Sequence, residues 1–293
     1  MRTYFPKIAA VLALLILAAC GTPPADEGPK PAATLPGYEA VQDGEFFIPA
    51  VEMAYLWGNQ ARAEVDYAGD ERPGSIIVDT HSRRLYFVLE GGRAMRFSIA
   101  VGREGLAFRG SGVIGRKEEW PSWTPTTNMV RTRPDLYAAY AGGLPGGLSN
   151  PLGARAMYLY RNGKDTMFRI HGTIDNASIS HATSAGCIRL FNQDAIYLYD
   201  RVEMGAQVYV RSLEDSIRIE GPYMDDAWGR AVPETPENIA QLEIDKRKII
   251  AVADAEALRL EHEAATQAET LAVDEAAAAR AAAKAARRAA ADA

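Results

Sequence analysis

Apolar and polar positions along the chain divide it into a β-rich middle and two flanks of different character. From Gly74 onward, β-branched and aromatic residues dominate short runs that are separated by turn sequences such as "DTHSRR" and "EGG". Such runs predict strands. Asn192 opens a run with helical apolar spacing and is expected to cap that helix. The pattern predicts a mainly β, mostly antiparallel domain with a short helix packed on it. The expected strands are 75–79, 84–89, 94–101, 154–160, 166–171 and 206–211, and the expected helix is 192–202.

A long segment between these strands, residues 105–153, is rich in glycine, proline and tryptophan. It contains so many helix- and strand-breaking residues that no regular element is expected there. A loop of this length in a compact domain is usually either functional or disordered. Its aromatic residues favour order, so we expect the wall or lid of a binding cleft; the alternative is a packing loop. These aromatic residues are Trp120, Trp123, Tyr137 and Tyr140.

The C-terminal flank has the composition of a helix. Residues 251–293 contain 21 alanines in 43 positions and neither glycine nor proline, which gives strong helix propensity with only a weak apolar stripe. Leu242 and Ile249 are one heptad apart, but the repeat is not sustained, so a coiled coil is not predicted. We expect an Ala-rich tail that is helical or disordered.

Charge is segregated along this tail. Residues 233–279 carry eleven acidic and four basic side chains, whereas residues 280–293 carry four basic and one acidic. A solvated helix or spacer accounts for most of this pattern. The alternative is a tip that contacts an anionic surface or a partner.

The N-terminal flank reads as a targeting segment. Arg2 and Lys7 precede an apolar run of twelve residues, 8–19. This run is shorter than the roughly 20 residues of a spanning helix but suits the core of a signal peptide. It ends in "LAAC", which resembles the bacterial lipobox, so Cys20 is expected to become the lipidated first residue of the mature protein. Gly21, rather than Asp, then favours the outer membrane; the alternative is an ordinary cleaved signal.

Composition excludes several classes of function. The net charge of −6 and the pI of about 5.4 argue against nucleic-acid binding, which usually needs a dominant basic face. With four histidines, two cysteines and neither a C-x-x-C nor an H-E-x-x-H motif, little remains for a zinc site. We therefore expect no metal and no cofactor.

The residues that are candidates for catalysis lie close together in "IHGTIDNASISHATSAGCIRL", residues 170–190. If Cys20 is lipidated, no second cysteine remains to form a disulfide with Cys187, and a reduced thiol in an oxidising compartment calls for a chemical role. A nucleophilic thiol needs a base, a turn that exposes sulfur, and donors for an oxyanion. His171, at the end of an apolar strand, is the candidate base. The alternative is a structural core thiol.

The remaining requirements are met by small residues around Cys187. The turn of residues 184–187 includes Gly186, which permits unusual backbone dihedrals. The N–H groups of Gly186 and Cys187 are candidate oxyanion donors. A carbonyl near Gly172 is a candidate for orienting the imidazole. Arg189 supplies a cation for a substrate carboxylate or for stabilising a thiolate; the alternative for Arg189 is a structural ion pair.

The motif "IHGT…S-x-G-C-I-R-L" resembles that of the YkuD-like L,D-transpeptidase catalytic domain, and the resemblance covers about residues 74–212. It implies that Cys187 is the nucleophile and His171 its base, and that Ser184 and Arg189 organise the site or bind substrate. Many members have histidine where Ala185 stands. His181 is expected to be an exposed loop residue rather than a replacement. The matching positions are His171, Gly172, Thr173, Ser184, Gly186, Cys187 and Arg189.

The resemblance also implies a reaction. Cys187 would attack the carbonyl between the third and fourth residues of a peptidoglycan tetrapeptide stem, expel D-Ala and form a thioester, which an amine then attacks. The acceptor is open: another stem (a 3-3 cross-link), an envelope protein, or water, which would make an L,D-carboxypeptidase. A second hypothesis is a catalytically silent lipoprotein that binds peptidoglycan and tethers membrane to wall. A generic cysteine peptidase comes third.

The expected organisation is an L,D-transpeptidase-type β-sandwich with a short helix and an Ala-rich C-terminal tail, in a lipoprotein of the cell envelope. The expected parts are a signal peptide (1–19), a linker with five prolines (20–36), an N-terminal extension packed on the domain (37–73), the catalytic domain (74–212) and a C-terminal extension (213–293). The expected site residues are Cys187 and His171 for catalysis, Gly186, Gly172 and Ser184 for orientation or the oxyanion, Arg189, Trp120 and Trp123 for substrate, and Cys20 for lipidation.

Overall fold

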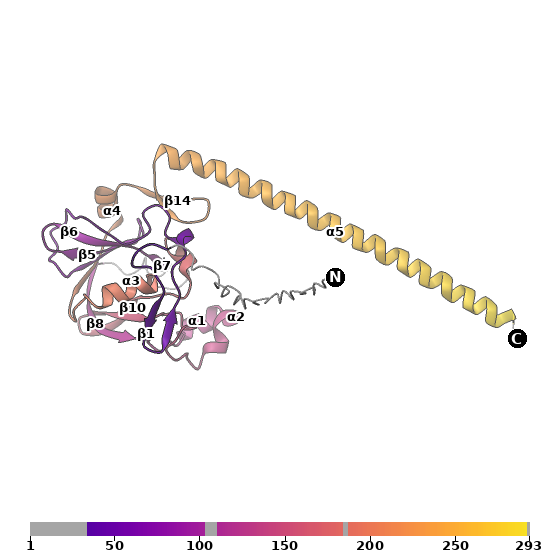
Figure 1. The fold of residues 1–293 in the computed structure, drawn as a ribbon, viewed down its shortest axis with the longest axis horizontal. Helices are drawn as coiled ribbons and strands as arrows, with labels where there is room; N and C mark the ends of the chain where they lie inside the picture. Colours follow the sequence, from indigo (N-terminus) through magenta and orange to yellow (C-terminus); the bar gives the residue numbers. More distant parts are fainter. Residues whose placement is uncertain (1–33, 103–109, 184–186, 292–293) are drawn as a thin grey trace, which may run out of the picture. The chain divides into compact units, whose positions relative to one another are not determined.

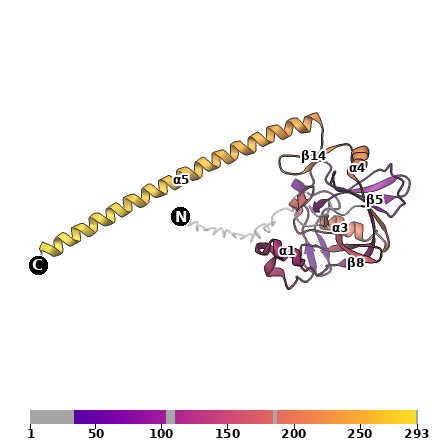
Figure 2. The same ribbon diagram turned by 180° about the vertical axis from the view of Figure 1, so that it is seen from behind.

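The computed structural model describes residues 34–102, 110–183 and 187–291. In Figure 1, α1 (Thr127–Thr132) and α2 (Pro134–Tyr137) lie together at one end of the β domain, and α4 (Leu213–Glu220) and β14 (Tyr223–Asp225) lie at the other; Figure 2 shows α1, α4 and β14 from behind. The elements are β1 (Val41–Asp43), β2 (Phe46–Ile48), η1 (Met53–Tyr55), β3 (Ala63–Asp66), β4 (Ile76–Asp79), β5 (Arg84–Leu89), β6 (Arg93–Ser98), β7 (Ala100–Gly102), β8 (Gly110–Glu119), α1 (Thr127–Thr132), α2 (Pro134–Tyr137), η3 (Ala138–Tyr140), β9 (Arg155–Arg161), β10 (Lys164–His171), η4 (Asn176–Ser178), β11 (Ala182–Thr183), β12 (Ile188–Arg189), α3 (Asn192–Tyr199), β13 (Gln207–Val210), α4 (Leu213–Glu220), β14 (Tyr223–Asp225), β15 (Ala231–Pro233) and α5 (Pro236–Ala291).

Within the described residues, one sheet of eleven strands forms the body of the domain. Its order is β11-β7-β12-β10-β9-β8-β13-β4-β5-β6-β3. Neighbouring strands are antiparallel except for β10 with β12, β11 with β7, and β13 with β4. The predicted mainly β, mostly antiparallel domain is therefore confirmed, and the single strand expected at 94–101 is divided into β6 and β7.

The sheet encloses one large apolar core. Side chains from β4, β5 and β6 meet side chains from β9, β10, β12 and helix α3, so the two halves of the sheet face each other as the layers of a sandwich. The buried residues include Ile76, Val78, Leu85, Phe87, Phe97, Ile114, Met157, Leu159, Ile170, Ile188, Leu190, Ala195 and Leu198.

Strand β8 contradicts the prediction that residues 105–153 lack regular elements. It spans ten residues and pairs with β9 on one side and β13 on the other. Its glycines looked like breakers, but Gly115 lies where a Cβ would come 2.3 Å from the ring of Tyr160. Glycine at this position admits a close neighbour rather than ending the strand. Helices α1 and α2 follow in the same segment.

The N-terminal extension is built into the domain. Strand β3 pairs with β6 as the edge of the large sheet. Tyr38 packs with Phe191 in a second buried cluster, with their rings edge to face at 5.8 Å. Arg62 forms an ion pair of 2.8 Å with Asp194 on α3, and the carboxyl of Asp194 is fully buried. The extension therefore packs against the helix that supports the core.

The Ala-rich tail, for which helix or disorder is expected, is helical in the structure and forms α5. It is a single helix of 56 residues (Figure 1), which corresponds to a length of about 84 Å at 1.5 Å per residue. In the part of the chain that the structure describes, no helix is both long and apolar enough to cross a membrane.

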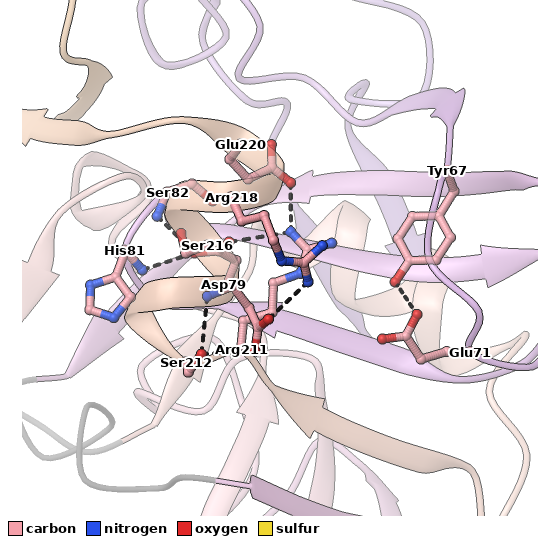
Figure 3. A network of polar contacts seen from close by, with 11 residues as sticks. Tyr67, Glu71, Asp79, His81, Ser82, Arg211, Ser212, Ser216, Arg218 and Glu220 are labelled. Atoms are coloured by element: carbon pink, nitrogen blue, oxygen red, sulfur yellow. Dashed lines mark hydrogen bonds and ion pairs between the residues drawn. The ribbon is translucent and has the colours of Figure 1, made fainter.

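A buried carboxylate ties helix α4 to the sheet (Figure 3). Asp79, at the end of β4, is fully buried. It accepts hydrogen bonds from the backbone N–H groups of His81 and Ser82, at 3.1 and 2.9 Å, and from the hydroxyl of Ser216 at 2.8 Å. Arg211 lies 3.3 Å from Asp79 and 2.6 Å from Glu220 on α4. The carboxylate thus holds a turn, a helix and a buried guanidinium together.

Replacing the carboxylate of Asp79 tests how much it contributes to the stability of the fold. We expect Asp79→Ala to lower the free energy of unfolding by about 3–5 kcal/mol, because it leaves buried donors without an acceptor and the Arg211 guanidinium short of a counter-charge. Urea unfolding measures this loss. The matched control is Asp215→Ala, whose carboxylate pairs with Arg218 in solvent and should cost about 1 kcal/mol or less. Equal losses in both variants would contradict the assignment.

Candidate active site

The parallel pairing of β10 with β12 sets the direction in which the candidate residues point. Ile170 lies opposite Ile188, and His171 lies opposite Arg189. Both isoleucines are buried in the core. Because side chains alternate along a strand, the residues that flank them point to the other face of the sheet. The flanking residues are Arg169 and His171 on β10, and Cys187 and Arg189 at β12.

All four of these side chains line one cavity of about 410 Å³. The structure therefore brings together a histidine and a cysteine that are sixteen residues apart in the sequence. Residues between 123 and 137 also line this cavity, and they belong to the segment for which the wall or lid of a cleft is expected. The other lining residues are Trp123, Thr124, Thr126, Asn128, Met129, Thr132, Arg133, Tyr137, Pro151, Leu152, Met167 and Phe168.

The imidazole of His171 is held by a backbone carbonyl. Its Nδ1 lies 2.5 Å from the carbonyl oxygen of Gly172. A carbonyl oxygen only accepts hydrogen bonds, so Nδ1 carries the proton and donates it. In the neutral ring, Nε2 then keeps its lone pair and can accept a proton. The His171 backbone is held as well, because its carbonyl accepts the N–H of Leu190 at 2.8 Å.

Burial keeps this histidine neutral. The side chain is almost completely buried, and its pKa is lowered from 6.5 to about 3, with desolvation as the largest cause. The positive charge of Arg189 lowers the pKa further, while the hydrogen bond to Gly172 opposes the shift. At neutral pH the ring is therefore an uncharged base.

Cys187 is half-buried and lies immediately before β12. Its carbonyl accepts a hydrogen bond of 3.2 Å from the N–H of Gly102 in β7, which holds the Cys187 backbone against the neighbouring strand. Ser184 and Gly186, for which roles in orientation or oxyanion binding are predicted, lie outside the described residues. The same is true of Cys20.

Asn192 is a positioning residue that sequence reasoning misread. The prediction that it caps α3 is wrong, because the N-cap is Phe191 and no side chain bonds to the first turn. The Asn192 side chain is buried; its Oδ1 accepts the N–H of Ala154 at 2.9 Å, and its Nδ2 donates to the carbonyl of Thr173 at 2.9 Å. It therefore joins the start of β9 to the segment that follows His171.

Gly172 leaves room for this contact. A Cβ at this position would lie 2.1 Å from the Oδ1 of Asn192. A side chain at Gly172 would therefore displace either Asn192 or the carbonyl that holds His171.

The three arginines of the cavity differ in what surrounds them. Arg169 pairs with Asp165 at 3.0 Å, and Arg133 pairs with Asp135 at 2.8 Å. For Arg189, the described part of the chain contains no ion pair, and its side chain is half-buried beside His171. Arg189 is thus the cation of this cavity that is best placed to receive a carboxylate from solution.

The two tryptophans proposed for substrate binding are separated. Trp123 lines the cavity, with its ring centroid 6.2 Å from that of Tyr137. Trp120 is not among the lining residues; its indole N–H donates to Asp43 at 2.8 Å and its ring packs on Phe46. The structure therefore assigns Trp120 to the attachment of the N-terminal extension, which sequence adjacency to Trp123 did not reveal.

His181 also departs from expectation. It is half-buried rather than exposed, in an isolated bridge to Arg230, and its Nδ1 lies 3.0 Å from the carbonyl oxygen of Ile179. It does not line the cavity.

Met167 is a cavity residue that no sequence pattern predicts. It lies where the register between β9 and β10 shifts, has a φ of +64° and is 62% exposed. The carboxylate of Asp165 accepts its N–H at 2.8 Å and supports this conformation. A large apolar side chain is thereby held at the rim of the cavity.

Within the described residues, no group of three or more histidine, cysteine or acidic side chains is arranged to hold a metal ion.

The low pKa of His171 predicts a pH dependence of stability. Above about pH 6.5 the ring is neutral in both the folded and the unfolded protein. Between pH 6.5 and about 3, only the unfolded protein takes up the proton, so the wild type loses stability as the pH falls. We expect the free energy of unfolding of His171→Gln to fall less steeply across this range, as measured by urea unfolding from pH 7.5 to 4.

The matched control is His262→Gln, which replaces an exposed histidine on α5. This variant should follow the pH profile of the wild type. A His171→Gln profile parallel to that of the wild type would contradict the assignment of a buried, neutral ring.

Comparison with known proteins gives the site its context. The family model described as the YkuD L,D-transpeptidase catalytic domain matches residues 73–210. The chain is 35% identical over 164 residues to a Fuscovulum blasticum protein, ORF 5 of the ATP synthase subunits region, whose name assigns it provisionally to the L,D-transpeptidases. The match covers 55% of this chain and 82% of that protein.

Two further similarities are more limited. The probable L,D-transpeptidase ErfK/SrfK of Escherichia coli K12 is 30% identical over 175 residues, which cover 59% of this chain and 54% of that protein, so the chain spans about half the length of this relative. The crystal structure of L,D-transpeptidase 3 from Mycobacterium tuberculosis is 16% identical, covers 47% of this chain and 60% of that chain, and has a TM-score of 0.35. With the family model matched and most of the Fuscovulum blasticum protein covered, the chain belongs to the YkuD L,D-transpeptidase family.

Proposed function

We propose that this protein is an L,D-transpeptidase that acts on the stem peptides of peptidoglycan through a thioester on Cys187. The observation that carries the proposal is that Cys187 and His171 line one cavity, on the same face of two paired strands. Membership of the L,D-transpeptidase family supports the substrate class.

In the first step, the Sγ of Cys187 attacks the carbonyl carbon between the third and fourth residues of a tetrapeptide stem. Nε2 of His171 accepts the thiol proton, which its neutral state allows. The tetrahedral intermediate then expels the amine of D-Ala. That amine takes the proton back from His171, and the stem remains bound to sulfur as a thioester.

In the second step, an acceptor amine attacks the thioester carbon. His171 removes a proton from the attacking nitrogen and returns it to the Cys187 thiolate as the C–S bond breaks. A side-chain amine of another stem gives a 3-3 cross-link, and an amine of an envelope protein gives an attached protein. Water in the same position would give a carboxypeptidase.

The cavity walls fit a substrate with a peptide backbone and carboxylates. Arg189 is proposed to bind a carboxylate of the stem. Trp123, Tyr137 and Met167 supply apolar surface for its aliphatic parts. Gly186 and Ser184 remain proposed contributors to the oxyanion site and to the order of the turn.

Intact-mass spectrometry of the protein from residue 21 onward tests this chemistry. Incubation with tetrapeptide muropeptides, or with a carbapenem, should add the mass of one acyl group on Cys187. Cys187→Ala should give no adduct, and His171→Ala should slow acylation by about 10²–10⁴-fold.

The matched control is His181→Ala, which removes a histidine outside the cavity and should leave the acylation rate unchanged. Wild-type protein that stays unmodified but still sediments with purified peptidoglycan would overturn the enzyme proposal in favour of a tether.

We also propose, from the sequence motif, that Cys20 is lipidated and anchors the protein in the cell envelope. Cys20→Ser should move the protein from the membrane fraction to the soluble fraction of cells, because the acyl chains supply the membrane affinity. Unchanged fractionation of this variant would contradict the anchor.

A further inference from the structure

Helix α5 presents one continuous apolar stripe. Because the helix is uninterrupted, positions spaced by three and four residues lie on one side of it. Large apolar residues recur along this side, with alanines between them and only two charged residues. The stripe consists of Ile239, Leu242, Lys246, Ile250, Ala253, Ala257, Leu260, Ala264, Ala268, Leu271, Glu275, Ala278 and Ala282.

Four of the five large apolar side chains of the stripe face solvent, and the fifth, Leu242, is half-buried. Ile239, Ile250, Leu260 and Leu271 are each between 45% and 63% exposed. A row of exposed isoleucine and leucine residues of this length is unusual on a protein surface and indicates an interaction. The alanines between them would let a second helix approach closely.

The spacing also explains the absence of a heptad repeat. A strict seven-residue repeat matches a supercoiled pair, whereas the spacing of this stripe stays close to 3.6 residues per turn over its whole length. A stripe with this period stays on one side of a straight helix over its whole length. It therefore fits a straight helical partner rather than a supercoiled one.

We propose that α5 pairs in antiparallel with the α5 of a second copy of this chain, about a two-fold axis beside Leu260. In this register, five pairs of stripe positions lie at equal distances from one midpoint between residues 260 and 261. An isologous contact of this kind repeats every pair on both sides of the axis. The pairs are Ile239 with Ala282, Lys246 with Glu275, Ile250 with Leu271, Ala253 with Ala268, and Ala257 with Ala264.

Charge complementarity selects this register. Lys246 and Glu275 are the only charged residues of the stripe, and the register that matches the apolar pairs also places them opposite each other. Glu237 and Lys284, both exposed, share the same midpoint. The acidic beginning of each helix therefore lies beside the basic tip of the other, which accounts for the segregated charge of the tail.

Charge also excludes the parallel arrangement. A parallel pair in register would place Lys246 beside Lys246 and Glu275 beside Glu275 of the second copy, and like charges at a helix contact oppose association. An anionic membrane would attract the basic tip but would repel the eleven acidic residues of the segment 233–279. A second copy of α5 places opposite charge beside both the acidic beginning and the basic tip of the helix, and it also covers the apolar stripe.

Sedimentation equilibrium of the full chain tests the proposal. We expect the wild-type chain to form a dimer with a dissociation constant in the micromolar range. Lys246→Glu and Glu275→Lys should each raise the dissociation constant of the dimer about tenfold, because each creates two like-charge contacts per dimer. The variant that carries both substitutions restores the opposite charges and should return to within about threefold of the wild type.

Several outcomes would overturn the proposal. The first is a wild-type chain that is still monomeric at about 100 μM, well above the micromolar dissociation constant expected for the dimer. The second is a double variant that dimerises as weakly as the single variants, and the third is association only with anionic vesicles. Circular dichroism of each variant should show unchanged helix content. Acylation of Cys187 should not change, so failure here leaves the proposed enzyme activity untouched.

Disulfide trapping tests the direction of the helices. A mixture of Ala253→Cys and Ala268→Cys chains should form a disulfide between the two new cysteines, identified by peptide mapping, while neither chain forms one with itself at that position. Ala255→Cys, on the opposite side of the helix, is the matched control and should not cross-link with Ala268→Cys. Self-linking of Ala253→Cys would indicate a parallel pair and would overturn the antiparallel arrangement.

Discussion

The parallel register between β10 and β12 is the constraint on which the site depends. It places Ile170 and Ile188 in the core and, by alternation, directs His171 and the residues beside Ile188 into the cavity. A shift of either strand by one residue would turn that strand's charged or reactive side chains toward the core and expose its isoleucine. The cost of burying polar groups and losing apolar burial therefore holds the candidate nucleophile and base on the same face.

A second set of contacts determines the state of the base. The carbonyl of Gly172 holds Nδ1 of His171, and the buried amide of Asn192 joins Thr173, the next residue along the chain, to Ala154 at the start of β9. Gly172 has no side chain because Asn192 occupies the space. The histidine is consequently buried, oriented and neutral before any substrate arrives, which is the arrangement that a general base needs.

Much of this architecture was predictable from local sequence patterns. The strands that carry His171, the helix after Cys187 and the Ala-rich helix all follow from apolar periodicity and composition, and the motif around Cys187 identified the family. What sequence reasoning missed depends on contacts between distant segments. The glycine in strand β8 is explained by the ring of Tyr160 beside Gly115. The place of Trp120 is explained by its hydrogen bond to Asp43, and that of Asn192 by the hydrogen bond it accepts from Ala154. A search for heptads does not reveal the stripe of α5, because the stripe has the period of a straight helix.

The neutral, Nδ1-protonated state of His171 is the claim that joins fold to proposed chemistry, and ¹⁵N NMR of labelled histidine measures it directly. We expect a protonated Nδ1 and an unprotonated Nε2 at pH 7, with ¹⁵N shifts that stay constant down to pH 4, because burial and Arg189 lower the pKa of the ring to about 3. A ring that titrates near pH 6.5, or one that carries its proton on Nε2 at neutral pH, would contradict the assignment of a neutral base held by Gly172.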